Sequence, residues 1–412
     1  MTGRLRLFAL TGLLLVLAAL TGCLDIFLLP VSDSTSRPSY SVSTTTGRPV
    51  TPSPTPAATA SPTLDLARSD AFDQQVSALI QAGLEARQKS IRLDAALEGY
   101  AVHEDKVKAL VDHLHALFGD LVWSQPRFFY LDGSFQIRYT VRSDQSVAGM
   151  SLEPGYWDET AGMDDAELDS LIRSVSDVVR SIADEIRSRS SLPRQQFILL
   201  HDTLVRHIAY DMQGDQQNNQ AASALLDRVT LCQGYAQSFQ WIGHELGLDV
   251  SIVTGTADGI GHAWNQVILN GRTYHVDVTH DDPAPDGGPD TPVRHVHLFR
   301  SDNQMSVTHQ WDRDEVPSCP DDGAFYYQDQ GLVFASAAEL ETELTRFVRQ
   351  ADLSSGKSVL FERFYTGQAP LTESAVEEIA QQALQELRTK QTIYYRAEWV
   401  KQVVLVQIGT GP

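Results

Sequence analysis

The chain has 412 residues, 42% of them hydrophobic, and carries 32 basic residues against 53 acidic ones. This length allows two or three domains with sizeable cores. A formal net charge of −21 argues against nucleic acid or an anionic membrane face as the main partner. The sequence contains no glycine-rich phosphate loop and no dinucleotide fingerprint, so we expect no cofactor.

The first residues are typical of a bacterial lipoprotein leader. Arg4 and Arg6 precede an apolar run, Leu7–Leu20, which is too short to span a bilayer comfortably. The following Thr21-Gly22-Cys23 completes a lipobox-like pattern, which predicts a signal peptide over residues 1–22 and a lipid anchor at Cys23. The protein would then be held at the extracytoplasmic face of the cell membrane. The alternative is an uncleaved anchor that continues to Leu29.

Two further segments precede the central part of the chain. Residues 23–63 are rich in Ser, Thr and Pro and are predicted to form an extended tether. Residues 64–190 are predicted to form an α+β module. Its expected elements are helices at Asp70–Gln88, Glu104–Phe118 and Asp164–Arg189, and a hairpin of Arg127–Leu131 with Ser134–Arg142 around Asp132-Gly133.

A helix with a cysteine at its start is predicted next. Thr230 and Gln233 have the spacing of a capping box, which places Cys232 in the first helical turn. Its buried face comprises Tyr235, Phe239, Ile242 and Leu246, and Gly247 ends the helix. A thiol at a helix N-terminus is favoured as the thiolate, which is the nucleophilic form. The alternative interpretation is a small apolar core residue.

A β-hairpin follows this helix. Residues 263–269 and 272–279 alternate around Asn270-Gly271, which favours a type I′ turn that pairs Leu269 with Arg272. The residues then sharing one face are His262, Trp264, Asp277 and Thr279. His262 and Asp277 become diagonal neighbours, roughly 7–8 Å apart at the backbone. A carboxylate at this position would hold the imidazole with its other nitrogen toward the thiol.

Three blocks carry a resemblance to a known family. CQGYAQSF from Cys232, GHAWNQV from Gly261 and YHVDVTHDDP from Tyr274 resemble the signature blocks of the bacterial transglutaminase-like superfamily, whose fold is related to papain-like thiol proteases. The likeness extends from Phe197 to Cys319. It implies a papain/transglutaminase-like α+β core in which the cysteine helix packs on an antiparallel sheet. It also implies that Cys232 is the nucleophile, His262 the base and Asp277 the third member.

The sequence departs from the family pattern at two places. Thr279-His280 stands where the family often has Thr-Trp, and Ala222 stands where it often has Tyr. The second departure removes a side-chain candidate for the oxyanion site, which leaves the Cys232 backbone N–H as the expected first donor. Gln233, Tyr235 and Trp264 are further tentative substrate-binding or oxyanion residues.

The remaining cysteine and the histidines are given structural interpretations. Cys319 is expected to be an inert packed thiol, and the alternative is a Cys232–Cys319 disulfide that would silence the nucleophile. No metal site is predicted, because the acidic loop at 281–290 lacks calcium-ligand spacing and no His-x-x-x-His motif occurs. The histidines interpreted as surface or hydrogen-bonded residues are His275, His280, His295, His297 and His309.

The domain plan is completed by residues 191–330 as the transglutaminase-like domain and residues 331–412 as a C-terminal α+β module. In the C-terminal module, strand, helix, strand and strand are expected at Lys357–Tyr365, Glu373–Leu387, Thr392–Trp399 and Gln402–Ile408. In the N-terminal module, the stretch from the expected strand at Lys89–Leu97 to Arg142 has the same order, which indicates a duplicated unit.

These observations predict an extracytoplasmic thiol enzyme that acts on amide bonds of proteins or peptides, with cell-wall peptides among the possible substrates. Transfer of the acyl group to an amine or to water would distinguish a transglutaminase from a protease or amidase, and the sequence leaves this open. The alternative function is an inactive surface module that binds peptide or cell-wall material.

Overall fold

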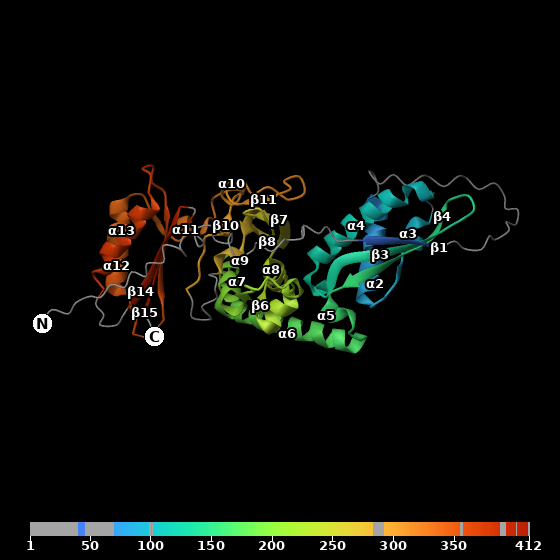
Figure 1. Ribbon diagram of the computed structural model, residues 1–412, viewed down its shortest axis with the longest axis horizontal. Coiled ribbons are helices and arrows are strands. Elements are labelled where there is room, and N and C mark those ends of the chain that lie inside the picture. Colours follow the sequence, from blue (N-terminus) through green and yellow to red (C-terminus); the bar gives the residue numbers. More distant parts are fainter. Residues whose placement is uncertain are drawn as a thin grey trace.

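The three larger sheets of the described residues lie in a row along the long axis of the molecule (Figure 1). The computed structural model describes residues 40–45, 70–98, 100, 102–282, 292–354, 357–387, 393–400 and 402–410. The predicted α+β class is confirmed, because helices pack against largely antiparallel sheets. Cys23, the predicted leader and most of the acidic loop fall outside these ranges. Within them, no helix is long and apolar enough to cross a membrane.

The N-terminal module is a sheet of order β1-β3-β4-β2 with helices packed on it. Its elements are β1 (Tyr40–Thr45), α2 (Asp70–Glu85), β2 (Ile91–Arg92), α3 (Asp94–Leu97), α4 (Val107–Ser124), β3 (Leu131–Val141), β4 (Val147–Tyr156) and α5 (Asp158–Ala161). Strand β1 lies inside the segment predicted to be a tether and pairs in parallel with β3. The apolar stripe of α4, which comprises Val107, Leu110, Val111, Leu114 and Phe118, is buried.

One predicted hairpin of this module is wrong. Strand β3 runs through Asp132-Gly133 without turning back, and it pairs with β4, which sequence analysis did not predict. The Asp132 carboxylate accepts the Ser134 N–H at 2.8 Å, and the register shifts there, so this pair makes a bulge. The chain reverses between Arg142 and Ser146 instead, where the Arg142 N–H donates to the Ser146 carbonyl at 2.8 Å.

The central part is a five-stranded sheet of order β10-β9-β8-β7-β11, with helices α6, α7 and α8 beside it. Its elements are α6 (Asp165–Arg189), α7 (Pro193–His207), β5 (Ala209–Tyr210), a π-helical turn (Ser223–Asp227), β6 (Val229–Thr230), α8 (Cys232–Glu245), β7 (Val250–Ala257), β8 (Ile260–Leu269), β9 (Arg272–Val276), α9 (Val278–Asp281), β10 (Leu298–Arg300), α10 (Asp302–Met305), β11 (His309–Trp311) and α11 (Tyr326–Asp329). The predicted long helix is confirmed, with Asp164 as its N-cap in a capping box with Glu167.

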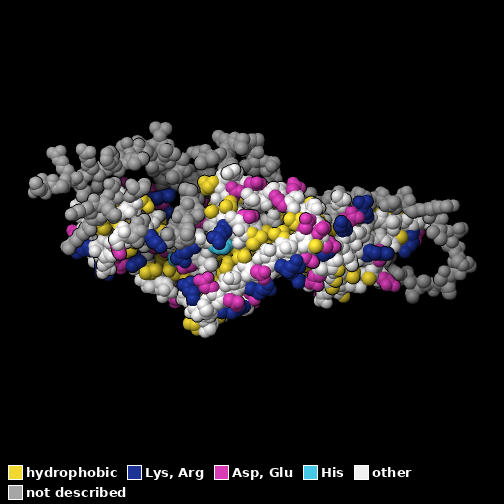
Figure 2. All heavy atoms as spheres, turned by 90° about the horizontal axis from the view of Figure 1, so that it is seen from below, with side chains coloured by type: hydrophobic (Ala, Val, Ile, Leu, Met, Phe, Trp, Pro, Cys, Tyr) yellow, Lys and Arg dark blue, Asp and Glu magenta, His cyan; other side chains and the backbone are white. Residues whose placement is uncertain are grey.

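The C-terminal module has a sheet of order β12-β13-β15-β14. Its elements are β12 (Val333–Phe334), α12 (Ala337–Gln350), β13 (Val359–Tyr365), α13 (Glu373–Leu384), β14 (Ile393–Val400) and β15 (Val403–Thr410). Sequence analysis missed α12. On the face seen in Figure 2, basic and acidic side chains are mixed along the molecule rather than segregated.

The predicted duplication stays a prediction, but the two flanking modules share part of their topology. The series α2-β2-α4-β3-β4 and α12-β13-α13-β14-β15 have the same connectivity. Their strands lie in the corresponding orders β2-β4-β3 and β13-β15-β14, and all of these neighbours are antiparallel. The N-terminal and C-terminal modules differ in how they join the central five-stranded part. One continuous apolar core runs from Phe72 to Ala324, whereas the C-terminal module has a core of its own.

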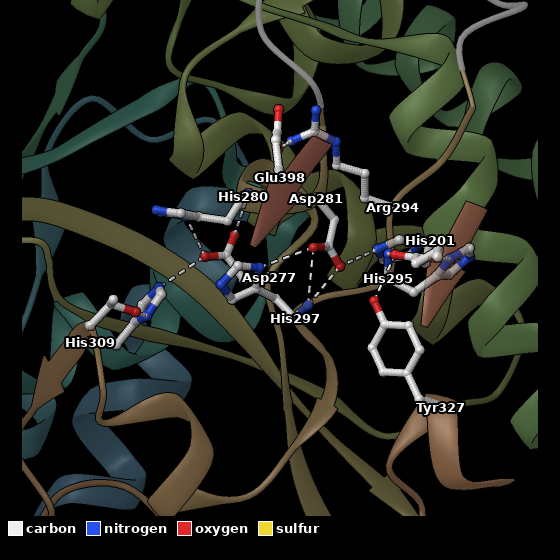
Figure 3. Close-up of polar contacts among 12 residues, drawn as sticks. His201, Asp277, His280, Asp281, Arg294, His295, His297, His309, Tyr327 and Glu398 are labelled. Atoms are coloured by element: carbon white, nitrogen blue, oxygen red, sulfur yellow. Dashed lines mark hydrogen bonds and ion pairs between the residues drawn. The ribbon is translucent and has the colours of Figure 1, made fainter. Parts of the chain in front are cut away.

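A buried polar contact attaches the C-terminal module to the centre. Glu362 on β13 accepts the His295 N–H at 2.8 Å, lies 3.0 Å from His295 Nδ1, and accepts the Tyr327 hydroxyl at 2.6 Å. His295 Nε2 lies 3.0 Å from an Asp202 oxygen on α7. Since both ring nitrogens face carboxylates, the ring is held as the imidazolium. Burial opposes this charge, but Asp202 and Glu362 raise the pKa of His295 to about 10. Figure 3 labels His295 and Tyr327.

This contact makes the free energy of unfolding fall as the pH rises into the alkaline range. Because the pKa of His295 is raised in the folded state, its contribution is complete below the unfolded pKa of about 6.5 and is lost as pH rises toward 10. At pH 6, we expect the free energy of unfolding of the unaltered chain to exceed that of His295→Gln. The difference between the two free energies should shrink by roughly 3 kcal/mol by pH 9.5.

Melting temperatures of both chains across this pH range would test the prediction. His103→Gln, at an exposed position, serves as the matched control and should show a gap near zero at every pH. A gap for His295→Gln that does not change with pH would contradict the assignment.

Candidate active site

Cys232 is the first residue of α8, as predicted, but the predicted capping box is wrong. The N-cap is Leu231, which makes no side-chain cap, and the Thr230 hydroxyl donates to the Asn218 carbonyl. The cap comes instead from Asn219, whose Oδ1 accepts the Gln233 N–H at 2.9 Å. The predicted end of the helix at Gly247 is confirmed (φ +79°). There the Leu248 N–H donates to the Gly243 carbonyl at 2.9 Å and completes a Schellman motif.

Gly234 allows the start of α8 to lie against the segment before it. A Cβ atom at this position would stand 2.0 Å from Thr230 Oγ1 and 2.9 Å from the Gln220 carbonyl oxygen. The Gln237 side chain makes a further link, since its Oε1 accepts the Ala221 N–H at 2.9 Å. These contacts fix the position of the thiol in the first turn of the helix.

The hairpin brings His262 and Asp277 together in the predicted way. Leu269 pairs with Arg272, and both turn residues have positive φ (54° at Asn270 and 75° at Gly271), as a type I′ turn requires. His262 Nε2 lies 2.9 Å from Asp277 Oδ2. The imidazole therefore has only Nδ1 left to face the thiol.

The predicted second strand is too long. Strand β9 ends at Val276, and Asp277 is the N-cap of the short helix α9 rather than a strand residue. Its carboxylate accepts the His280 N–H at 3.2 Å. An Asp side chain that satisfies a free N–H at a helix start stabilises the helical turn, which explains why the ladder stops here.

The three groups carry coupled charges. Burial alone would raise the pKa of the Cys232 thiol, but attraction to His262 and hydrogen bonds from His262 and the Ala263 N–H lower it. Burial lowers the pKa of His262, whereas the charges of Asp277 and Cys232 raise it to about 10. The pKa of Asp277 is held well below its ordinary value by His262 and His280, against the effect of burial. The arrangement favours a thiolate beside an imidazolium.

Two histidines that sequence analysis did not assign to the site also face Asp277. His280 Nδ1 lies 2.7 Å and His309 Nε2 lies 3.0 Å from the same Oδ2 atom (Figure 3). His280 is three residues after Asp277, so the turn of α9 brings it back. His309 arrives on β11, which pairs with β7. Burial lowers the pKa of His309 to about 4, despite Asp277.

The tentative substrate-binding residues turn out to be structural. Tyr235 and Trp264 are each 1% exposed. The Tyr235 hydroxyl donates to the Asp282 carboxylate, and Trp264 Nε1 donates to His275 Nδ1 at 3.0 Å. The Trp264 ring stacks on His262 with a centroid distance of 5.9 Å, so it supports the imidazole from behind. Gln233 is half-buried beside the thiol.

Both cysteines of the described part of the chain are free, so the disulfide alternative is wrong. Cys319 is buried, and Gln266 Nε2 donates to its sulfur at 3.1 Å. Burial raises the pKa of Cys319 to about 12. Cys232, in contrast, is half-buried and accessible.

The histidines interpreted as surface or hydrogen-bonded residues contact carboxylates, and several of them converge on the same one. Three groups among the described residues have nitrogen, oxygen or sulfur ligand atoms within 4.8 Å of one another. They are His262 with Asp277, His280 and His309; His201 with Asp202 and His295; and His275 with Asp302 and Cys319. Of these groups, only the first lies beside the Cys232 thiol. In it, three histidines face one carboxylate oxygen.

A second carboxylate lies beside the site at the end of α9. Asp281 is fully buried; its oxygens accept the His297 N–H at 2.9 and 3.0 Å, and Oδ2 lies 3.1 Å from His201 Nε2. Burial opposes ionisation, but these hydrogen bonds lower the pKa of Asp281. The contact ties α9 to helix α7 and thereby fixes the turn that carries Asp277.

Residues 180–278 match the family model of the Transglutaminase-like superfamily. Among solved structures, the chain is similar to one described as a TGase, with 10% identity, 37% of this chain and 53% of that chain covered, and a TM-score of 0.27. It is also similar to the periplasmic domain of TgpA from Pseudomonas aeruginosa, with 17% identity, 34% and 60% covered, and a TM-score of 0.21. No curated protein matches the chain significantly.

The chain spans 53% and 60% of the lengths of those two structures. The TM-scores are low, so the assignment depends on the family match, which contains the helix of Cys232 and the hairpin of His262 and Asp277. The predicted fold is confirmed at this level, because residues 180–278 match the model of the Transglutaminase-like superfamily.

Proposed function

We propose that the chain is a thiol enzyme that acts on amide bonds of proteins or peptides through Cys232, His262 and Asp277. A family match to transglutaminase-like proteins supports a thiol enzyme in general terms. The observation that carries the specific proposal is the 2.9 Å contact of His262 Nε2 with Asp277, beside a free thiol at a helix start. A nucleophile, a base and a group that orients the base are the parts that acyl transfer requires.

The reaction would proceed through a thioester. The Cys232 thiolate attacks the carbonyl carbon of the amide, and His262 Nδ1 donates its proton to the leaving amine. An incoming amine or water then gives its proton to His262 while it attacks the thioester, and the thiolate leaves. Asp277 keeps the imidazole oriented and stabilises its positive charge in both steps.

The developing oxyanion would be bound at the N-terminus of α8. Cys232 is the first residue of α8, and the first N–H groups of a helix have no partner within the helix and lie at the positive end of its dipole. Ala222, the position where a Tyr was considered, is buried and apolar. The proposed enzyme therefore depends on backbone donors rather than on a hydroxyl.

We further propose that the enzyme works outside the cell, anchored through a lipid on Cys23. The support is the leader-like sequence and the Ser/Thr/Pro-rich segment behind it. Surface proteins and cell-wall peptides would be the substrates available in that location. The competing function, an inactive binding module, needs no reactive thiol at Cys232.

Replacement of the nucleophile tests the proposal directly. The purified chain would be incubated with acyl-donor peptides, with and without a primary amine, and the products followed by mass spectrometry. We expect Cys232→Ala to abolish both hydrolysis and amine incorporation, by about 10⁴-fold or more, because the covalent step is lost. Cys319→Ala is the matched control and should retain activity. Product formation that persists in Cys232→Ala would contradict the mechanism.

Thiol reactivity against pH tests the ion pair itself. Because the pKa of Cys232 is lowered, the thiolate is present at pH 6, and alkylation by iodoacetamide should remain fast there. His262→Ala removes the charge that stabilises the thiolate, so the rate at pH 6 should fall by at least about tenfold and recover at pH 9.

Peptide mass spectrometry distinguishes the two thiols in this assay. The buried Cys319, with its raised pKa, is an internal reference that should stay unlabelled in the folded chain. A Cys232 rate that rises with pH as for an ordinary thiol, and does not respond to His262→Ala, would favour the binding module.

A further inference from the structure

We propose that His262, Asp277, His280 and His309 form a binding site for a divalent transition-metal ion of the zinc class, and that a bound ion holds the thiol enzyme inactive. The binding site stands on geometry alone. The inhibitory effect rests on the function proposed above.

Three imidazole nitrogens converge on one carboxylate oxygen. His280 Nδ1, His262 Nε2 and His309 Nε2 lie 2.7, 2.9 and 3.0 Å from Asp277 Oδ2. All four ligand atoms lie within 4.8 Å of one another, so a single ion can reach each of them with small adjustments. Zinc is bound by His nitrogen and Asp oxygen at about 2.0–2.2 Å in a tetrahedral arrangement, which needs four such groups.

The rings are arranged around a common centre. Their centroids are separated by 4.7 Å between His262 and His280, 5.0 Å between His280 and His309, and 5.5 Å between His262 and His309. The ring planes are inclined to one another by 58–87° rather than stacked. The rings therefore meet edge to face, which lets each nitrogen point toward the common centre.

The proposed reaction uses only part of this set. Orientation of His262 needs the carboxylate of Asp277 and neither of the other imidazoles. His280 Nδ1 is a buried atom that lies 2.7 Å from Asp277 Oδ2, the oxygen that His262 Nε2 and His309 Nε2 also face. The opposite edge of His280 gives the ion a path, since 28% of this side chain is exposed.

Neighbouring groups fix the orientation of the ligands. His309 Nδ1 lies 2.9 Å from the Thr308 hydroxyl, which directs Nε2 toward Asp277. The second Asp277 oxygen accepts the His280 N–H, which leaves Oδ2 as the ligand atom. Such outer contacts are typical of histidine metal sites.

Occupation of the site would remove the base. An ion on His262 Nε2 displaces the proton that this nitrogen shares with Asp277, and one proton is released to solvent. The metal-bound imidazole then keeps a single proton, on Nδ1, and is no longer the imidazolium that stabilises the Cys232 thiolate. It cannot give that proton to a leaving amine without becoming an imidazolate. Asp277 is meanwhile held by the ion. The thiol then loses both its base and the orienting carboxylate.

Cobalt(II) binding tests the site without the thiol. Cobalt would be titrated into the Cys232→Ser chain, followed by visible absorption and by calorimetry. We expect one ion per chain with the intense visible bands of a tetrahedral site, and affinity at least about tenfold weaker in His309→Gln and in His280→Gln. His280→Gln is included as the second variant because the His280 side chain is partly exposed and lies outside the apolar core.

His295→Gln, in the second group of potential ligands, is the matched control and should bind cobalt as the parent does. Absence of a tetrahedral spectrum, or binding that is unchanged in both His309→Gln and His280→Gln, would overturn the site. Circular dichroism would show that each variant remains folded.

Zinc and thiol alkylation test the inhibition in the chain with Cys232 intact. Stoichiometric zinc should slow iodoacetamide labelling of Cys232 by at least about tenfold, and a chelator should restore it, while His280→Gln should require about tenfold more zinc. Equal sensitivity of His280→Gln would show that zinc binds the thiol itself and would overturn the inhibitory role. An unreactive Cys232 without zinc would end the proposed function, whereas the cobalt result in Cys232→Ser would still stand.

Discussion

The ionised carboxylate of Asp277, completely withdrawn from solvent, is the group on which the rest of the site depends. A buried charge of this kind is stable only when polar partners surround it. Here His262, His280 and His309 approach one oxygen, and the other accepts a backbone N–H. The strand that carries His262, the helical turn at α9 and the β7–β11 pair are thereby held in one arrangement.

The same kind of contact recurs beyond Asp277. Asp281, Asp202 and Glu362 alternate with imidazoles along a buried path from α9 through α7 to β13. Loss of one partner leaves an unpaired charge in the interior, which costs more than the contact itself contributes. Elements that are far apart in the sequence are therefore tied together by polar groups, beside an ordinary apolar core.

Local chemistry explains what could be predicted from the sequence. The turn at Asn270-Gly271 fixes the register of β8 with β9, and the stop at Gly247 is set by a left-handed residue. Both depend on residues within a few positions. The contact of His262 with Asp277 follows from that register and was therefore predictable, as were four elements of the C-terminal module and the start of α8 at Cys232.

The errors have physical reasons of the same kind. Thr230 has the spacing of a cap, but its hydroxyl is used by the Asn218 carbonyl, and Asn219 makes the cap from a preceding segment. Asp277 leaves the strand because its carboxylate caps a helical turn. His309 was missed because its place depends on the pairing of β11 with β7, which no local pattern encodes.

The two flanking modules differ in how their apolar cores join the central part of the molecule. The N-terminal module shares its apolar interior with the central helices, so it cannot separate without exposing that interior to water. The C-terminal module keeps a closed interior of its own and meets the centre through a small apolar cluster and the Glu362 contact. Modules of similar topology thus serve at one end as a wall of the main body and at the other as a unit with an interior of its own.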